Sequence, residues 1–319
     1  MLKIYINNET SELVSVILGS AISNGPTPNI EDCYDPKSIE HILNGTYPAE
    51  KDMISELNSF ENILVKYGVK VYRPDQINNY NQIFTRDISF VIEDKIVLSN
   101  MIDNRSSELS AINYILNEIS SKNIIKLSSD SHVEGGDVIL HNDYVFIGIY
   151  SGEDYPNYIT ARTNLNAVNE IKTHFPNKII KTFELRKSNS SPMDNALHLD
   201  CCFQPIGKDK AIIYPGGFLI KDEYDWLINF FGKENIFETT KEEMYNMNCN
   251  VFSISENVIV SENNFIRLNE WLISKEFTVE KINYSEIAKQ EGLLRCSTMP
   301  LIRKQSNFEK TNYKYYFDD

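Results

Sequence analysis

The sequence contains an internal repeat, which limits the folds that this chain can adopt. Two apolar runs make a hairpin-like pair four times, and each pair begins at a polar residue, in DISFVIEDKIVLS, DVILHNDYVFIGI, DCCFQPIGKDKAIIYP and NVFSISENVIVSE. The starting residues are Asp87, Asp137, Asp200 and Asn250, which are 50, 63 and 50 residues apart. That spacing is about what one sheet-and-helix unit needs in a repeat architecture. The pattern therefore predicts a chain of similar units.

The residues between the hairpins complete each unit. A helix-like stretch and then a short apolar strand follow each hairpin, the helices at 106–120, 162–175, 222–231 and 263–275 and the strands at 124–127, 179–183, 236–239 and 277–282. Each unit therefore reads ββαβ. A degenerate fifth copy comes from 13–19, 50–68 and 69–74. No linker rich in Pro, Gly or Ser divides residues 1–319, so the sequence predicts an α/β fold in a single domain.

Charge and cysteine usage narrow the class of partner. The formal net charge of −14 disfavours nucleic acid, because phosphate binding needs clustered Lys and Arg. A small cationic ligand suits an acidic surface better. The five cysteines form no CxxC pair, which favours a reduced, cytoplasmic setting. The N-terminus lacks the features of a signal peptide, and no run approaches the roughly 18 apolar residues of a membrane span.

The polar residues at the strand starts are the candidates for chemistry. Asp87 lies in FTRD, Glu134 in EGGD, and both His198 and Asp200 in HLD, while Cys296 lies in LLRCSTMPL near the C-terminus. If five units surround an axis, their strand ends converge and these side chains share one pocket. The set would then contain a nucleophile, a base, a carboxylate to orient the base and two further carboxylates.

Cys296 is the candidate nucleophile, on a loop or at a strand end. A cysteine serves in that role only if its pKa is lowered or a neighbour takes its proton, and otherwise it packs as a small apolar residue. Cys202 is the rival, because His198, Asp200 and Cys202 alternate along a predicted strand and share one face. Cys201 points to the other face, so the two adjacent cysteines are not expected to hold zinc.

His198 is predicted to donate and accept the proton, since the ordinary pKa of histidine is near neutrality. A hydrogen-bonded core histidine is the alternative. Glu134 is interpreted as the carboxylate that orients the His198 ring, and the two glycines after it as a turn or bulge. His132 shares the face of Glu134 and is the second choice of base. The remaining histidines are expected at the surface, namely His41, His141 and His174.

Asp87 and Asp200 match a planar cation. A guanidinium presents forked N–H donors, so two carboxylates can hold it and fix the carbon between them. The alternative for Asp87 is a surface ion pair with Arg86. Arg162 and Arg105 begin helices, and each is either a clamp for a substrate carboxylate or an ordinary solvent-exposed arginine.

These motifs, in this order on ββαβ repeats, resemble the guanidino-group-modifying superfamily called the penteins over nearly the whole chain. That superfamily includes arginine deiminases, dimethylarginine dimethylaminohydrolases and amidinotransferases. The resemblance implies a five-bladed α/β propeller with Cys296 as nucleophile, His198 as acid and base, and Glu134 as the partner of the histidine.

The same resemblance implies how the substrate is held. Asp87 and Asp200 would grip the guanidinium, and Arg162 would bind the substrate carboxylate, with Arg105 as the weaker match. The thiolate attacks the guanidino carbon, the histidine protonates the departing amine, and a covalent amidino-thioether remains. Neither a metal nor a cofactor is implied.

Three functions follow from this resemblance. EGGD and ARTN look more like the hydrolase branches, so we expect water to release a ureido product from a small guanidino substrate. VYRPD, RDI and the spacing of Asn195 before HLD look more like amidinotransferases, in which an amine accepts the amidino group. A binder without catalysis is the third alternative. Residues 21–50 are expected to form a lid or an insertion, and a homo-oligomer is plausible on general grounds.

Overall fold

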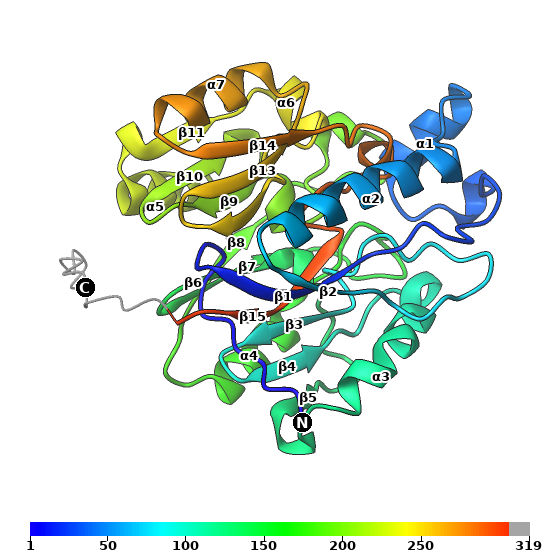
Figure 1. Ribbon diagram of the computed structural model, residues 1–319, viewed down its shortest axis with the longest axis horizontal. Coiled ribbons are helices and arrows are strands. Elements are labelled where there is room, and N and C mark those ends of the chain that lie inside the picture. The colour runs from blue at the N-terminus through cyan, green and yellow to red at the C-terminus, as the bar shows by residue number, and fades with distance from the viewer. Residues whose placement is uncertain (306–319) are drawn as a thin grey trace.

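Five three-stranded sheets make up the part of the chain that the structure describes, residues 1–305 of a computed structural model (Figure 1). The sheets have the strand orders β15-β1-β2, β3-β4-β5, β6-β7-β8, β11-β10-β9 and β12-β13-β14. The strands are β1 Leu13–Leu18, β2 Lys70–Tyr72, β3 Ser89–Ile92, β4 Lys95–Leu98, β5 Ile124–Lys126, β6 Val138–His141, β7 Tyr144–Ile149, β8 Ile179–Glu184, β9 Phe203–Ile206, β10 Lys210–Ile213, β11 Ile236–Glu238, β12 Phe252–Ser255, β13 Val258–Glu262, β14 Thr278–Ile282 and β15 Thr298–Arg303.

Four of the five sheets are built in the same way. An antiparallel hairpin supplies two strands, and a third strand lies parallel to the middle one. In the β6-β7-β8 sheet, Val138 pairs with Ile147 across the hairpin, and Tyr144 pairs with Ile179 across the parallel ladder. A parallel neighbour requires a crossover connection, which the helical residues provide. The predicted ββαβ repeat is therefore confirmed, and the arrangement of the five sheets is that of an α/β propeller.

The first sheet joins the two ends of the described chain. β1 pairs antiparallel with β15, with Leu18 opposite Thr298, and β2 lies parallel to β1 on its other edge. The degenerate fifth copy is thus completed by a strand from the C-terminal part of the chain. This closure brings the turn before β15 next to the starts of the other sheets.

α3 Asn113–Leu116, α4 Leu165–His174, α5 Lys221–Phe231 and α7 Ile266–Ser274 each lie between a hairpin and the third strand of its sheet. α1 Pro36–Leu43 and α2 Glu50–Lys66 lie between β1 and β2, and α6 Lys241–Tyr245 lies between β11 and β12. No helix within residues 1–305 is both long and apolar enough to cross a membrane. The helix predicted over 106–120 is present over most of that range, but it is mainly a 3-10 helix, η2 Asp103–Ile112, and only its last turn, α3, is α-helical. Its buried Arg105 and Glu108 pair at i and i+3, the two positions that eclipse in 3-10 geometry.

The strand predicted over 198–202 is also wrong. Leu199–Cys201 form one turn of 3-10 helix, η6, and β9 begins only at Phe203. The amide of Leu199 donates to Oδ1 of Asp137 at 2.9 Å, which holds the turn against the preceding sheet. The common face inferred from strand alternation therefore does not exist, and the HLD side chains diverge from a turn.

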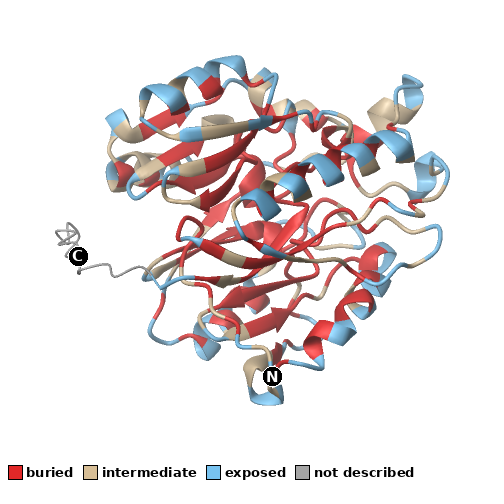
Figure 2. Ribbon diagram, in the orientation of Figure 1, coloured by how far each residue is buried: buried red, intermediate tan, exposed pale blue. Residues whose placement is uncertain are grey.

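Buried side chains fill the strands and the centre of the molecule, while exposed residues gather on the outer helices (Figure 2). His141, expected at the surface, is instead buried and packs against the rings of Phe146 and Phe231. Burial lowers the pKa of His141 to about 4. Its place at a hairpin end did not imply exposure, because α5 covers that end. His174 is exposed as predicted, and His41 is partly buried.

Candidate active site

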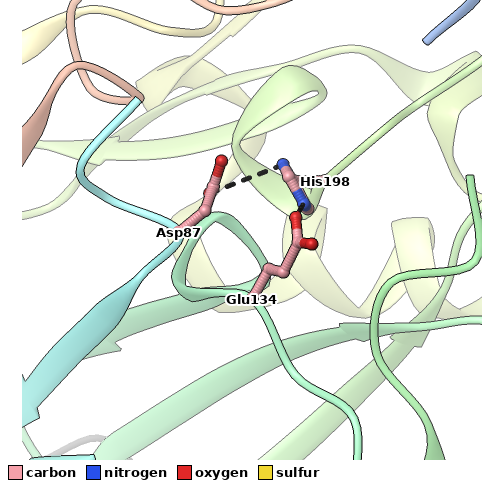
Figure 3. Close-up of side chains that lie close together, drawn as sticks. All are labelled: Asp87, Glu134 and His198. Carbon is pink, nitrogen blue, oxygen red and sulfur yellow. Dashed lines mark hydrogen bonds and ion pairs between the residues drawn. The ribbon is translucent and has the colours of Figure 1, made fainter. Parts of the chain in front are cut away.

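Three buried side chains that precede different sheets meet at one place (Figure 3). Nε2 of His198 lies 2.8 Å from Oε2 of Glu134, and Nδ1 lies 3.7 Å from Oδ1 of Asp87. Each residue stands shortly before the first strand of its sheet, at β3, β6 and β9. The strand starts do converge, and the histidine is held between two carboxylates.

A glycine permits this close approach. A Cβ at Gly136 would lie 2.7 Å from the His198 ring and 2.8 Å from Oδ1 of Asp87, a spacing that real Cβ atoms essentially never show. The amide of Gly136 donates instead to the same Asp87 oxygen at 3.1 Å. The second glycine of EGGD is thus required for packing, in addition to the turn, η4 Gly135–Asp137, that the sequence indicated.

Cys296 lies in the turn before β15, against Asp200 and Asn250. Its Sγ is 3.6 Å from Oδ2 of Asp200 and 3.1 Å from Nδ2 of Asn250. Oδ1 of Asn250 accepts the amides of Arg295 and Cys296 at 2.9 and 3.1 Å, which fixes the turn. Sequence reasoning missed Asn250 as a site residue, although it occupies the same repeat position as Asp87 and Asp200.

The resting site favours a neutral thiol and a charged imidazole. Burial raises the pKa of Cys296 well above its usual value, and Asp200 and Asp87 raise it further. Burial opposes the charged form of His198, but Asp87 and Glu134 outweigh burial and raise its pKa. The thiol therefore needs a nearby positive charge or a base before it can ionise.

Arg105 is fully engaged by protein acceptors. Its Nη1 donates to Oδ2 of Asp87 at 2.7 Å, and Nε and Nη2 donate to the two oxygens of Glu108 at 2.7 and 3.0 Å. It is buried, so the solvent-exposed alternative is wrong. The surface pair between Arg86 and Asp87 is wrong as well, because Arg86 is buried and its Nε donates to the Arg295 carbonyl at 3.3 Å.

Arg162 joins the site to the predicted lid. Its Nη1 donates to Oε2 of Glu134 at 2.8 Å, and its Nη2 donates to the carbonyl of Tyr34 at 2.6 Å. Burial opposes ionisation of Glu134, but Arg162 and His198 outweigh it and hold the pKa of that carboxyl well below its usual range. The Tyr34 ring also lies 5.9 and 5.7 Å from the guanidinium carbons of Arg105 and Arg162. Residues 21–50 thus cover the arginine side of the site.

Two further buried charges support the turn that carries Cys296. Nη1 of Arg295 donates to Oδ2 of Asp200 at 2.8 Å, and its Nη2 donates to Oε1 of Glu9 at 3.0 Å. Arg86 adds a longer contact to Glu9, at 3.8 Å. Arg295 had a signal in the sequence, since it precedes the cysteine directly. Glu9 had none, because only the folded chain brings the N-terminal segment beneath the site.

The histidine centre also has the spacing of a metal site. One ligand atom from each of Asp87, Glu134 and His198 lies within 4.8 Å of the others. Arg105 and Arg162 already donate to those two carboxylates, so a divalent cation would face two guanidinium groups. The arrangement suits a network of ion pairs better than a metal centre.

The second-choice residues have other contacts. Cys202 belongs to the hydrophobic cluster around β9 and β10, and its Sγ is 3.4 Å from the Leu199 carbonyl. Nδ1 of His132 is 2.8 Å from Oδ2 of Asp154, and its ring stacks on Tyr155. These contacts favour a packing role for Cys202 and a peripheral ion pair for His132. All five cysteines are free.

Comparison with known proteins agrees with this geometry. Residues 45–303 match the family model described as N,N dimethylarginine dimethylhydrolase, eukaryotic. The chain is 32% identical over 225 residues to the Uncharacterized protein YkgA of Bacillus subtilis (strain 168), with 70% of each chain covered. It is 24% identical over 265 residues to the arginine deiminase of Pediococcus pentosaceus, covering 70% of this chain and 62% of that one.

A solved structure extends the likeness to the whole fold. SxtG, an amidinotransferase from Microseira wollei, superposes with a TM-score of 0.72 and 18% identity, covering 96% of this chain and 99% of that one. The five-sheet fold, the buried carboxylates and these matches define a guanidino-group-modifying enzyme of the pentein superfamily. Within that superfamily, the chain belongs to the family described as N,N dimethylarginine dimethylhydrolase, eukaryotic.

Proposed function

We propose that this enzyme is a cysteine hydrolase that acts on the guanidino carbon of arginine or a substituted arginine. The observation that carries the proposal is the contact of the Cys296 thiol with Asp200, with Asp87 close enough to raise the same thiol pKa. Two carboxylates beside a thiol suit a planar cation whose carbon must lie over sulfur. The family match and the arginine deiminase relative support this substrate class. The free cysteines support a reducing, cytoplasmic setting.

The substrate itself would activate the nucleophile. A guanidinium between Asp87 and Asp200 offsets the two negative charges that hold the Cys296 pKa high, so the bound cation favours the thiolate. The thiolate then attacks the guanidino carbon. Orientation by the paired carboxylates contributes much of the rate, because three nitrogens share the charge and make that carbon a poor electrophile.

His198 would move the protons. Its raised pKa keeps a proton available for the departing amine, and Glu134 holds the ring at 2.8 Å. After the amine leaves, neutral His198 takes a proton from water while the water oxygen bonds to the amidino carbon. The C–S bond then breaks and releases a ureido product and the free thiol.

Arg162 would bind the substrate carboxylate, with Arg105 as a weaker candidate. Nη2 of Arg162 now donates to the Tyr34 carbonyl, so a carboxylate oxygen can take the place of that acceptor when residues 21–50 move. Arg105 is bound by Asp87 and by both oxygens of Glu108, which leaves it less able to change partners.

An amidinotransferase is the second candidate. The observation that favours it is the likeness to SxtG across nearly the whole of both chains. In that reaction an amine, rather than water, attacks the amidino-thioether. Product analysis with and without glycine, ornithine or lysine separates the two. Faster amidination of an added amine than release of a ureido product would make the hydrolase assignment wrong.

The test of the covalent step is rapid acid quench with a panel of guanidino compounds, followed by intact-protein mass spectrometry and peptide mapping. We expect an added amidino-type mass on the peptide that contains Cys296. Adduct yield then ranks the substrates. Ligand-induced stabilisation without an adduct would favour the binder that lacks catalysis.

The matched control is a second buried cysteine. Cys296→Ala should remove turnover by at least about 1,000-fold, since the nucleophile acts in every step. Cys202→Ala should retain turnover and lose only stability, because that side chain packs in the core. If Cys202→Ala abolished turnover and Cys296→Ala retained it, Cys202 would be the nucleophile.

A further inference from the structure

The residue that begins a hairpin unit makes a similar contact in three of the four units. Its side-chain oxygen accepts a backbone amide from the turn that precedes the next sheet. Oδ1 of Asp87 accepts the Gly136 amide at 3.1 Å, in the turn before β6. Oδ1 of Asp137 accepts the Leu199 amide at 2.9 Å, in the turn before β9. This contact requires only an oxygen acceptor, which aspartate and asparagine both supply.

The last unit makes this contact with an asparagine. Oδ1 of Asn250 accepts the amides of Arg295 and Cys296 at 2.9 and 3.1 Å, in the turn before β15. Backbone amides only donate, so the side-chain atom that faces them is the oxygen, and this fixes the direction of the NH₂ group. That group donates to Sγ of Cys296 at 3.1 Å and to the Asp200 carbonyl at 3.3 Å. Asn250 is fully buried, and the protein uses both its N–H groups and its oxygen.

An N–H donor at this sulfur opposes the negative charges around it. Burial, Asp200 and Asp87 all raise the pKa of Cys296. A hydrogen bond donated to the thiolate favours the charged form, whereas an aspartate at position 250 would place another carboxylate oxygen against the sulfur. The charged or titratable groups that face the thiol are Asp87, Asp200, Cys201, Tyr284 and Arg295.

We propose that Asn250 is a catalytic residue, whose Nδ2–H group stabilises the thiolate of Cys296. This inference rests on the proposed function, since it takes Cys296 as the nucleophile. Asn250 transfers no proton and forms no bond to the substrate. It acts on the charge of the sulfur before the attack, and again when the C–S bond breaks and its electron pair returns to the sulfur. The amide thus replaces the aspartate of the other units at the one position that contacts the nucleophile.

Asn250→Asp tests this role, because it keeps an oxygen for the two backbone amides and removes the donor to sulfur. The rate at which iodoacetamide alkylates Cys296, followed by peptide mapping near pH 8 and 9, reports the thiolate fraction without any substrate. Asn250→Asp should lower this rate at least about 100-fold, and kcat/KM for a guanidino substrate should fall by a similar factor. Asn250→Ala, which adds no charge, should lower the alkylation rate about 10-fold and serves if the aspartate variant fails to fold.

Asn269→Asp is the matched control. Asn269 is 2% exposed on α7, and its Nδ2 donates to the Glu262 carbonyl at 2.9 Å, so the variant should lose stability but keep the alkylation rate and kcat/KM. If Asn250 only held the turn, its loss would loosen the turn and expose the sulfur. Alkylation would then become faster in Asn250→Ala.

Faster or unchanged alkylation in the Asn250 variants, or equal slowing by Asn269→Asp, would overturn the inference. Its failure and that of the proposed function are distinguishable, because alkylation requires no guanidino compound. Slower alkylation in the variants of a protein that forms no Cys296 adduct would reject the proposed function and leave the thiolate contact in place. Turnover by the parent with unchanged alkylation in the variants would reject the role of Asn250 alone.

Discussion

Buried arginines set the charge of the site residue by residue. Each of three arginines donates to one carboxylate of the candidate site, the pairs being Arg105 with Asp87, Arg162 with Glu134, and Arg295 with Asp200. Removing one partner of such a pair leaves a buried charge without compensation, at a cost of about 3–5 kcal/mol. Substitutions here change stability as well as activity, and the pH dependence of unfolding separates the two effects.

Asp87→Asn should destabilise the protein more at pH 6 than at pH 9. Asp87 helps to raise the pKa of His198, so this part of the stability is fully present below the unfolded pKa of the histidine, about 6.5, and is lost as pH rises through the higher folded value. Urea unfolding at both pH values measures the difference, which should be about 1 kcal/mol. In a His198→Gln background, the cost of Asp87→Asn should be the same at both values, and a persistent difference would contradict the assignment.

Glu9→Gln should destabilise the protein by about 3 kcal/mol at neutral pH and lower kcat/KM, because Arg295 then loses the partner that orients it toward Asp200. Burial alone would raise the pKa of Glu9, but Arg295 and Arg86 outweigh it and lower the pKa to about 2. The stabilisation is therefore present above the ordinary value near 4.5 and is lost as pH falls toward 2.

The control for Glu9 lies three residues away. Glu12 pairs with Lys304 at 2.6 Å on the surface, so Glu12→Gln should change the free energy of unfolding by no more than about 1 kcal/mol. Glu9→Asp should recover part of kcat/KM. If Glu9→Gln and Glu12→Gln changed the free energy of unfolding equally, the contact of Glu9 with Arg295 would contribute no more than a surface ion pair.

At the scale of elements, the repeat pattern predicted the hairpins and most helices, and it failed where tertiary contacts bend the chain. Leu199–Cys201 follows a polar and apolar alternation typical of a strand, yet the carboxylate of Asp137 captures the Leu199 amide and produces a turn. Residues 106–120 have helical patterning, yet Arg105 holds Glu108 in 3-10 spacing. The local pattern of polar and apolar residues does not indicate either of these contacts.

The segment over the site should respond to ligand. Residues 33–43 contact Arg162 through the Tyr34 carbonyl, which a substrate carboxylate is proposed to displace before the segment closes again on the substrate. Hydrogen exchange of their amides should therefore change when a guanidino amino acid binds to Cys296→Ser, and exchange in β6 should not. Unchanged exchange over 33–43 under saturating ligand would rule out a lid.

For the whole molecule, closure of the first sheet ties distant parts of the chain together. β15 pairs with β1, and isolated bridges join Ile6 to Glu93 and Asn8 to His141. We propose that residues 1–305 unfold as a single domain. The fluorescence of Trp226 and Trp271, which lie on α5 and α7, should change at the same urea concentration as the far-ultraviolet circular dichroism. Separate midpoints would show that the fourth and fifth sheets unfold on their own.

The repeat, the sheets and the motif residues could be predicted from the sequence, because strand and helix periodicity and the glycine, histidine and cysteine motifs are local properties. The remaining contacts arise only in the folded chain. Glu9 reaches Arg295 only because β15 closes on β1, and Arg162 reaches the Tyr34 carbonyl only because the segment before α1 folds against the site. His141 is buried only because α5 covers it. Such contacts depend on which distant segment packs against a given residue. The spacing of residues along the chain does not indicate which segment that is.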